Sequence, residues 1–186
     1  MFLRPLLAAL VAVSSPLASE PVRPTAYFVN IGYVEQVWCT HSAGTAFIAG
    51  GHKISVAHVT NEEGCRIGNR PIIAHREKND FSTIEQILPV EGLKINCDGF
   101  KEGEQYWAIG YAQAFPVQRA IPLTGTGEMD HGEALLIGYP TVIPGMSGGP
   151  ILDSQGRVVG TVNMYSTAYP LSWSVQLKDT SVCSKS

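Results

Sequence analysis

The chain has 186 residues, a formal net charge of −3 at pH 7, and 45% hydrophobic against 16% charged residues. This length suits one domain or two small ones that share a core, and the composition is that of a globular protein. No run of lysine or arginine interrupts the sequence, so we expect no nucleic-acid partner. Few charges, 19 glycines and frequent valine, isoleucine, threonine and tyrosine favour an all-β protein rich in turns.

The first 18 residues differ from the rest of the chain. Arg4 precedes an unbroken apolar run over residues 6–13, and small, turn-prone residues follow up to Ala18. This layout is typical of a secretory signal peptide, and the apolar run is too short to span a bilayer. The alternative is a short buried strand or helix at the terminus. We predict a signal peptide over residues 1–18, a secreted or periplasmic protein, and no stable membrane insertion.

Beyond residue 18, short β-like runs bounded by turns dominate, and helical periodicity is scarce. A polar, glycine-rich stretch over residues 97–103 divides these runs into two comparable sets. We therefore predict two β lobes, over residues 19–97 and 98–186, with a cleft between them. The predicted strands are 27–29, 35–38, 44–48, 53–56, 71–75, 83–87, 106–110, 117–122, 134–137, 150–152, 158–165 and 173–175.

The four cysteines of an exported chain favour disulfides, for which three pairings are possible. We favour Cys39–Cys65 together with Cys97–Cys183. The first pair would close a loop of moderate size, worth about 3 kcal/mol in the chain-entropy model. None of the cysteines has the C-x-x-C spacing of a zinc site, and we predict neither a metal nor another cofactor.

The segment over residues 145–150, Gly-Met-Ser-Gly-Gly-Pro, is the most informative part of the sequence. Glycine permits positive φ angles and close approach of another molecule. Such a turn presents the Ser147 hydroxyl outward and aims the N–H groups of Gly145 and Ser147 at one point. An oxyanion sits at that point during acyl transfer. The alternative is an ordinary glycine-rich turn that carries a solvated serine.

A serine hydroxyl needs a base within hydrogen-bond reach and a third group that orients this base. His58 ends an apolar strand and follows the small Ala57, which lets its ring turn into a cleft; the alternative is a structural histidine. Asp80, just before a β-like run, is the candidate acid. Asp98 is the rival, but an Asp-Gly pair more often marks an exposed turn.

In this order, the segments 56–58 (Val-Ala-His), 79–81 (Asn-Asp-Phe) and 145–150 resemble the three motif regions of chymotrypsin-like serine proteases. The strands around them are similar to those of bacterial trypsin-like and HtrA-like members, and the resemblance covers roughly residues 25–175. It implies two six-stranded Greek-key β-barrels with the active site in the cleft between them. It also implies a polypeptide substrate and no cofactor, and we expect a monomer.

The resemblance also implies the roles of single residues. Ser147 would attack the scissile carbonyl, His58 would take its proton and later protonate the leaving amine, and Asp80 would fix the tautomer of His58. The N–H groups of Gly145 and Ser147 would bind the oxyanion.

Further positions follow from the same resemblance. The strand that contains Val162, Asn163 and Met164 resembles the strand along which the substrate backbone pairs. Thr141 lies in the expected specificity pocket, which offers no acid for lysine or arginine, so we expect small or apolar side chains there. The alternative is an acidic side chain, bound by hydroxyl groups at Thr141 or nearby. Met146 stands where trypsins keep the aspartate of their zymogen switch, so we expect activation without that switch.

Two other functions compete with that of a secreted serine endopeptidase. An α/β-hydrolase esterase needs a strand–turn–helix at the serine and a histidine downstream of it. No histidine follows Ser147, and Pro150 and Gly156 interrupt any helix there, which argues against this class. The other alternative is a catalytically silent binding protein that keeps the protease-like fold.

Overall fold

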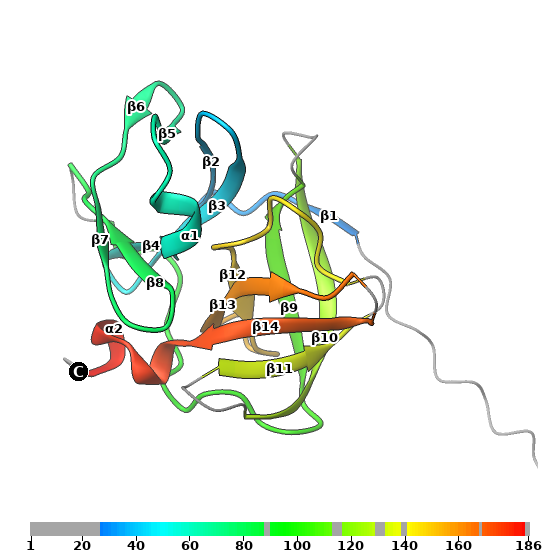
Figure 1. Cartoon of the computed structure of the whole chain (residues 1–186). Coiled ribbons are helices and arrows are strands. Elements are labelled where there is room, and N and C mark those ends of the chain that lie inside the picture. Colours follow the sequence, from blue (N-terminus) through cyan, green and yellow to red (C-terminus); the bar gives the residue numbers. More distant parts are fainter. Residues whose placement is uncertain are drawn as a thin grey trace, which may run out of the picture.

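The computed structural model describes residues 27–87, 90–112, 117–128, 133–138, 141–167 and 169–184. The predicted signal peptide over residues 1–18 lies outside them. Fourteen strands in two antiparallel sheets account for about half of the described residues, and the described helices are short (Figure 1). The all-β, two-barrel fold class predicted from the sequence is confirmed.

The N-terminal sheet is a half-barrel of seven short strands in the order β6-β5-β2-β3-β4-β8-β7. Its edge strands β6 and β7 do not pair with each other within the described residues, so the sheet stays open. Helix α1 follows β4 without a linker, which sets His58 at the end of that strand. The elements are β2 (Val34–Trp38), β3 (Ala43–Ala49), β4 (His52–Val56), α1 (Ala57–Thr60), β5 (Arg66–Ile67), β6 (Arg70–Pro71), β7 (Ala74–Arg76) and β8 (Phe81–Ile84).

The C-terminal sheet closes into a six-stranded barrel in the order β9-β10-β11-β14-β13-β12, because β9 pairs with both β10 and β12. Strand β1 adds to the outer edge of β10, with Tyr27 opposite Ala120. The elements are β1 (Tyr27–Val29), β9 (Gln105–Tyr111), β10 (Gln118–Glu128), β11 (Glu133–Ile137), β12 (Pro150–Leu152), β13 (Val158–Tyr165), β14 (Leu171–Gln176), the 3-10 helix η2 (Leu177–Asp179) and α2 (Ser181–Ser184).

Each predicted strand overlaps an observed one, and the differences have local causes. Strand β10 runs six residues beyond the predicted end at residue 122. The sequence of this part resembles a turn because it contains two glycines, Gly125 and Gly127. These glycines form a bulge, where the register with β11 shifts. The predicted strand 71–75 is split, because Ile72 and Ile73 separate β6 from β7.

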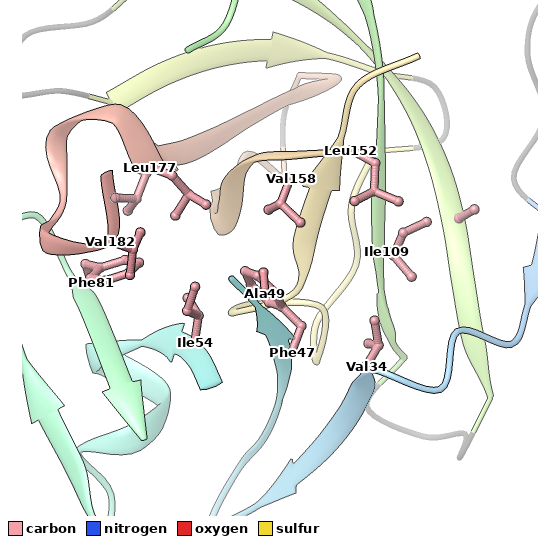
Figure 2. Close-up of a cluster of buried hydrophobic side chains, with 12 residues drawn as sticks. Val34, Phe47, Ala49, Ile54, Phe81, Ile109, Leu152, Val158, Leu177 and Val182 are labelled. Carbon is pink, nitrogen blue, oxygen red and sulfur yellow. The ribbon is translucent and has the colours of Figure 1, made fainter. Parts of the chain in front are cut away.

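A single hydrophobic cluster joins the two lobes (Figure 2). Burial of apolar side chains from both sheets in one core opposes their separation. The N-terminal sheet contributes Val34, Phe47, Ala49, Ile54 and Phe81, and the C-terminal half contributes Ile109, Ala120, Leu152, Val158, Val175, Leu177 and Val182.

Both favoured disulfides are present. The Cys39–Cys65 bond joins residues 26 positions apart, and the Cys97–Cys183 bond joins residues 86 positions apart. The longer loop is worth about 4 to 5 kcal/mol in the chain-entropy model. The Cys97–Cys183 bond joins α2 to the segment between the two lobes. Among the described helices, none has the length and apolar character required to cross a membrane.

Candidate active site

Asp80 lies in the tight turn between β7 and β8. The N–H of Phe81 donates to the Lys78 carbonyl at 3.3 Å, which closes a four-residue turn. Its two central residues, Asn79 and Asp80, both have positive φ angles, of 59° and 60°. Positive φ at both central positions is the mark of a type I′ turn, whose second position favours glycine. Asp80 therefore occupies a backbone conformation that its side chain disfavours.

Three hydrogen bonds join Asp80 to the start of α1. The carboxylate oxygen Oδ2 lies 2.5 Å from His58 Nδ1, and Oδ1 accepts the His58 N–H at 2.7 Å. The Asp80 carbonyl accepts the N–H of Ala57 at 2.7 Å. This geometry assigns the imidazole proton to Nδ1 and leaves Nε2 as the basic nitrogen. The His58 side chain is 46% exposed, so Nε2 is open to an approaching group.

The turn that contains Ser147 is also defined by its hydrogen bonds. The Met146 N–H donates to the Ile143 carbonyl at 3.1 Å, and Gly145 has a φ of +92°. These are the features of a type II turn, with Pro144 at its second position and Gly145 at its third. The N–H of Gly148 then donates to the Val162 carbonyl at 2.7 Å, and the N–H of Gly149 to the Met146 carbonyl at 2.9 Å.

Two N–H groups of residues 145–149 remain without a partner in the part of the chain that the structure describes. They belong to Gly145 and Ser147. Most backbone N–H groups in folded proteins are paired, so two free donors in one turn call for an explanation. They are the two donors that the sequence predicted for an oxyanion. An ordinary glycine-rich turn that merely exposes a serine gives no reason for both to stay free.

The Ser147 hydroxyl donates to the Asn163 carbonyl at 3.2 Å. Within the described residues, no hydrogen bond joins it to His58. Their two segments nevertheless meet at Gly44. A Cβ placed on Gly44 would lie 2.5 Å from the Val59 side chain and 3.2 Å from the Ser147 carbonyl oxygen. Helix α1 and the Ser147 turn therefore pack against the same glycine, and catalytic hydrogen bonds in ligand-free sites are often not yet formed.

The predicted substrate-binding residues occupy different environments. The backbone N–H and carbonyl of Val162 both bind the Ser147 turn, through Gly149 and Gly148, so Val162 anchors that turn. Asn163 is 3% exposed and donates through Nδ2 to Glu133 Oε1 at 3.1 Å, whereas Met164 is 58% exposed.

The predicted pocket residue Thr141 pairs with a hydroxyl on β14. Its Oγ1 lies 3.3 Å from Ser172 Oγ and donates to the Leu171 carbonyl at 3.5 Å. Sequence reasoning missed Ser172 and also Glu133, the partner of Asn163, because neither lies near a motif. Their contacts arise only when β11, β13 and β14 come together in the barrel.

Two further candidates, Asp98 and Met146, have side chains that lie outside this constellation. Asp98 is exposed, and its only described hydrogen bond is from its own N–H to Asn96 Oδ1. Met146 is fully buried in the core of the C-terminal barrel, where its thioether packs among apolar side chains. No group of three or more histidine, cysteine, aspartate or glutamate residues in the described ranges is arranged to hold a metal ion.

Two cavities, of about 310 and 810 Å³, lie on the N-terminal half-barrel. They share residues of β4 and β8, and the larger one extends to β5 and β6. Neither cavity is lined by His58, Asp80 or Ser147. The candidate active site therefore lies outside both cavities.

Comparison with known proteins gives a fold but no close relative. No protein-family model and no curated protein matches the chain. Solved structures do match, and their fold is the two-barrel fold of trypsin-like and HtrA-type serine proteases.

The active form of the Rv3671c protease from M. tuberculosis is 20% identical, with a TM-score of 0.64 over 89% of both chains. The serine endoprotease from Yersinia pestis is 16% identical, with a TM-score of 0.63 over 77% of this chain and 58% of that one. The HtrA-type protease AlgW with a tripeptide is 18% identical, with a TM-score of 0.63 over 78% of this chain and 56% of that one. This chain thus spans little more than half the length of the last two. At identities this low, the structural similarity establishes a shared fold and nothing more.

Proposed function

We propose that this protein is a serine endopeptidase that uses Ser147, His58 and Asp80 through an acyl-enzyme. The observation that carries the proposal is the pair of unpartnered N–H groups on Gly145 and Ser147, in a turn whose other N–H groups are all bonded. Two fixed donors beside a serine hydroxyl suit an oxyanion that forms when that hydroxyl attacks a carbonyl. The Asp80–His58 pair supplies the oriented base that such an attack requires.

The reaction follows from these positions. His58 Nε2 takes the proton of the Ser147 hydroxyl while Oγ forms a bond to the substrate carbonyl carbon. The carbonyl oxygen becomes negative and accepts the N–H groups of Gly145 and Ser147. His58 then gives its proton to the amine as the C–N bond breaks, which leaves an acyl-enzyme. A water molecule then gives a proton to His58 and attacks the acyl carbon. His58 returns this proton to the Ser147 oxygen as the ester bond breaks, which releases the acid. Asp80 accepts the Nδ1–H of His58 throughout.

Before the attack, the Ser147 hydroxyl has to leave the Asn163 carbonyl. Rotation about the single Cα–Cβ bond moves Oγ between staggered positions without any change in the backbone. The backbone N–H groups that would bind the oxyanion therefore stay in place during this rotation. The substrate backbone, pairing along β13 from Asn163 onward, is a natural competitor for the carbonyl that holds the hydroxyl at rest.

The hydrogen bond between Ser147 and Asn163 also favours a second candidate function. A serine that stays on the Asn163 carbonyl is not activated, and the protein would then be a silent binding protein with a protease-like fold. The two functions differ in one chemical property, the nucleophilicity of the Ser147 oxygen.

Fluorophosphonate labelling tests this property directly, since the reagent reacts with an activated serine. We expect labelling of the wild-type protein at Ser147 and hydrolysis of an unfolded, fluorescently labelled protein. Both should be lost in Ser147→Ala with no change in the far-UV circular dichroism spectrum. Ser154→Ala, at an exposed hairpin position, is the matched control and should keep both. A folded wild-type sample that is neither labelled nor active would contradict the protease function and leave the binding protein as the alternative.

Two finer properties belong to the same proposal. The two disulfides support location in an oxidising compartment, either outside the cell or in a periplasm. The segment expected to form the specificity pocket, residues 141–144, contains no acid for basic side chains, which supports cleavage after small or apolar residues. A peptide-library profile measures this preference, and products that consistently end in lysine or arginine would contradict it.

A further inference from the structure

Thr45 lies on β3 in the N-terminal half-barrel and is completely buried. It nevertheless binds the Ser147 turn of the C-terminal barrel at two points. Its backbone N–H donates to the Ser147 carbonyl at 2.8 Å. Its hydroxyl Oγ1 donates to the Gly145 carbonyl, also at 2.8 Å. One residue of one lobe thus holds the carbonyl groups of the two residues whose N–H groups remain free.

These two hydrogen bonds complete the fixation of two peptide units. The unit between Gly145 and Met146 is held at its N–H end by Ile143 and at its carbonyl end by the Thr45 hydroxyl. The unit between Ser147 and Gly148 is held at its N–H end by Val162 and at its carbonyl end by the Thr45 N–H. A planar peptide unit moves as one body, so hydrogen bonds at both of its ends restrict its rotation. The free N–H groups of Gly145 and Ser147 belong to the preceding peptide units, and each of these is joined to one of the two restricted units through a single Cα atom.

The direction of the Thr45 hydroxyl is itself determined. Oγ1 accepts the Tyr111 N–H at 3.1 Å, and a threonine hydroxyl has a single hydrogen to donate. That hydrogen therefore points to the Gly145 carbonyl. The Thr45 carbonyl in turn accepts the Ser55 hydroxyl at 2.8 Å, which fixes the backbone on the other side.

We propose that Thr45 is a positioning residue that sets the angle of the two oxyanion-binding N–H groups across the interface between the lobes. This inference rests on the proposed protease function, because it concerns the same site. It assigns no substrate contact to Thr45. The oxyanion site in the C-terminal barrel is then complete only when the N-terminal half-barrel is docked against it.

A set of variants at one position tests the role of the hydroxyl. Thr45→Val keeps the shape of the side chain and removes the donor to Gly145. We expect kcat to fall about 10- to 100-fold, as for a misplacement of catalytic groups by about 1 Å. We expect KM to change less than about twofold, because a pure transition-state interaction is lost. Thr45→Ser restores the donor and should bring kcat back to within about threefold of the wild type.

Thr126→Val is the matched control, since it removes a threonine hydroxyl that donates to a backbone carbonyl, Leu135, at 2.9 Å on the β10–β11 side of the barrel. It should lose some stability and keep kcat. If Thr45→Val does not fold, Thr45→Cys replaces it, because a thiol is a weak donor of similar size and should give the same fall in kcat with unchanged KM.

The outcomes distinguish a failure of the protease function from a failure of the role proposed for Thr45. A wild-type protein without fluorophosphonate labelling or hydrolysis contradicts the protease function itself. An active wild type together with a folded Thr45→Val or Thr45→Cys variant of unchanged kcat leaves the protease function standing and overturns the role of Thr45. A fall in kcat that Thr45→Ser does not reverse, or that Thr126→Val shares, would mark a structural effect and also overturn it.

Discussion

The two turns that bring chemical groups to the candidate site reach positive φ angles in opposite ways. The Ser147 turn uses glycine, with φ of +92° at Gly145 and +85° at Gly148, where glycine adopts such angles without steric cost. The Asp80 turn uses Asn79 and Asp80, whose Cβ atoms disfavour the same region. In the first turn the backbone itself supplies the candidate oxyanion donors. In the second turn a side chain supplies the candidate acid.

This difference indicates where the fold accepts strain. Glycine at position 80 would relieve the turn, but it would delete the carboxylate that binds His58. Backbone strain at a functional position persists only when the surroundings determine the conformation. Here, both the N–H and the hydroxyl of Ser181 bind the Glu77 carboxylate, three residues before Asp80. Phe81, the next residue, is fully buried in the cluster that joins the lobes.

The largest expected effect distinguishes a glycine that is needed for space from one that is needed only for its φ angle. A Cβ on Gly148 would lie 2.2 Å from the Thr45 carbonyl oxygen and 2.4 Å from Ser55 Oγ, in addition to the cost of the positive φ. We expect Gly148→Ala to lower the free energy of unfolding by about 4 kcal/mol or more and to abolish activity. Chemical denaturation with the disulfides intact measures this loss.

Gly156→Ala is the matched control for that variant. Gly156 has a φ of +73° and no atom within 4 Å of an added Cβ. The cost of the backbone conformation alone is about 1 kcal/mol. Equal losses in the two variants would mean that Thr45 and Ser55 do not confine the Ser147 turn.

The sequence predicted the fold because its signals are local. Short apolar runs between turns marked most strands, and the even number of cysteines suggested the two disulfides. Strand β5 was missed because it has only two residues and too little pattern to detect. The open edge of the N-terminal half-barrel depends on which strands pair, and no single segment determines that.

The candidate site was predictable where a residue type is chemically distinctive. Ser147 and His58 could be selected by their surroundings in the sequence, and Asp80 by its place before a strand. Thr45 could not be selected, because its partners Gly145 and Ser147 lie about one hundred residues away and belong to the other barrel. The hydrogen bond of Ser147 to Asn163 and the positive φ of Asp80 are likewise conformational facts, which residue identities do not determine.

The Ser147 side also contains a network of hydrogen bonds around a buried aspartate. Asp153, in the hairpin that follows Ser147, is 7% exposed and accepts hydrogen bonds from Arg157, Asn96 and the Gln155 N–H. Burial by itself would raise the pKa of the Asp153 carboxyl group. The hydrogen bonds, chiefly those from the Arg157 backbone and side chain, outweigh burial and hold its pKa below the usual value.

Asp153→Asn should therefore lower the free energy of unfolding at neutral pH by about 2 kcal/mol, because the charge-assisted hydrogen bonds from Arg157 are lost. The folded-state pKa lies below the unfolded one, so the ionised carboxylate stabilises the fold above the unfolded value of about 3.9. This stabilisation is lost as the pH falls through the folded-state pKa. The difference in free energy of unfolding between wild type and variant should become smaller in that acid range. Asp98→Asn, at an exposed aspartate, is the matched control and should leave the free energy of unfolding at neutral pH unchanged. A difference between wild type and Asp153→Asn that stays constant with pH would contradict the charge argument.

The smallest expected effect isolates the strain in the Asp80 turn. Asp80→Gly and Asp80→Ala both delete the carboxylate and its two bonds to His58, and they differ only by one Cβ at a φ of +60°. Both should lose activity by about four orders of magnitude, the effect of losing the group that orients a catalytic histidine. The glycine variant should nevertheless be more stable than the alanine variant by about 1 kcal/mol, because only alanine keeps the steric cost. Denaturant titrations of the two variants measure this difference without any contribution from the lost hydrogen bonds. Equal stabilities would mean that the turn relaxes once the carboxylate is gone, and that the bonds to His58, rather than the neighbouring Glu77 and Phe81, hold Asp80 in its disfavoured conformation.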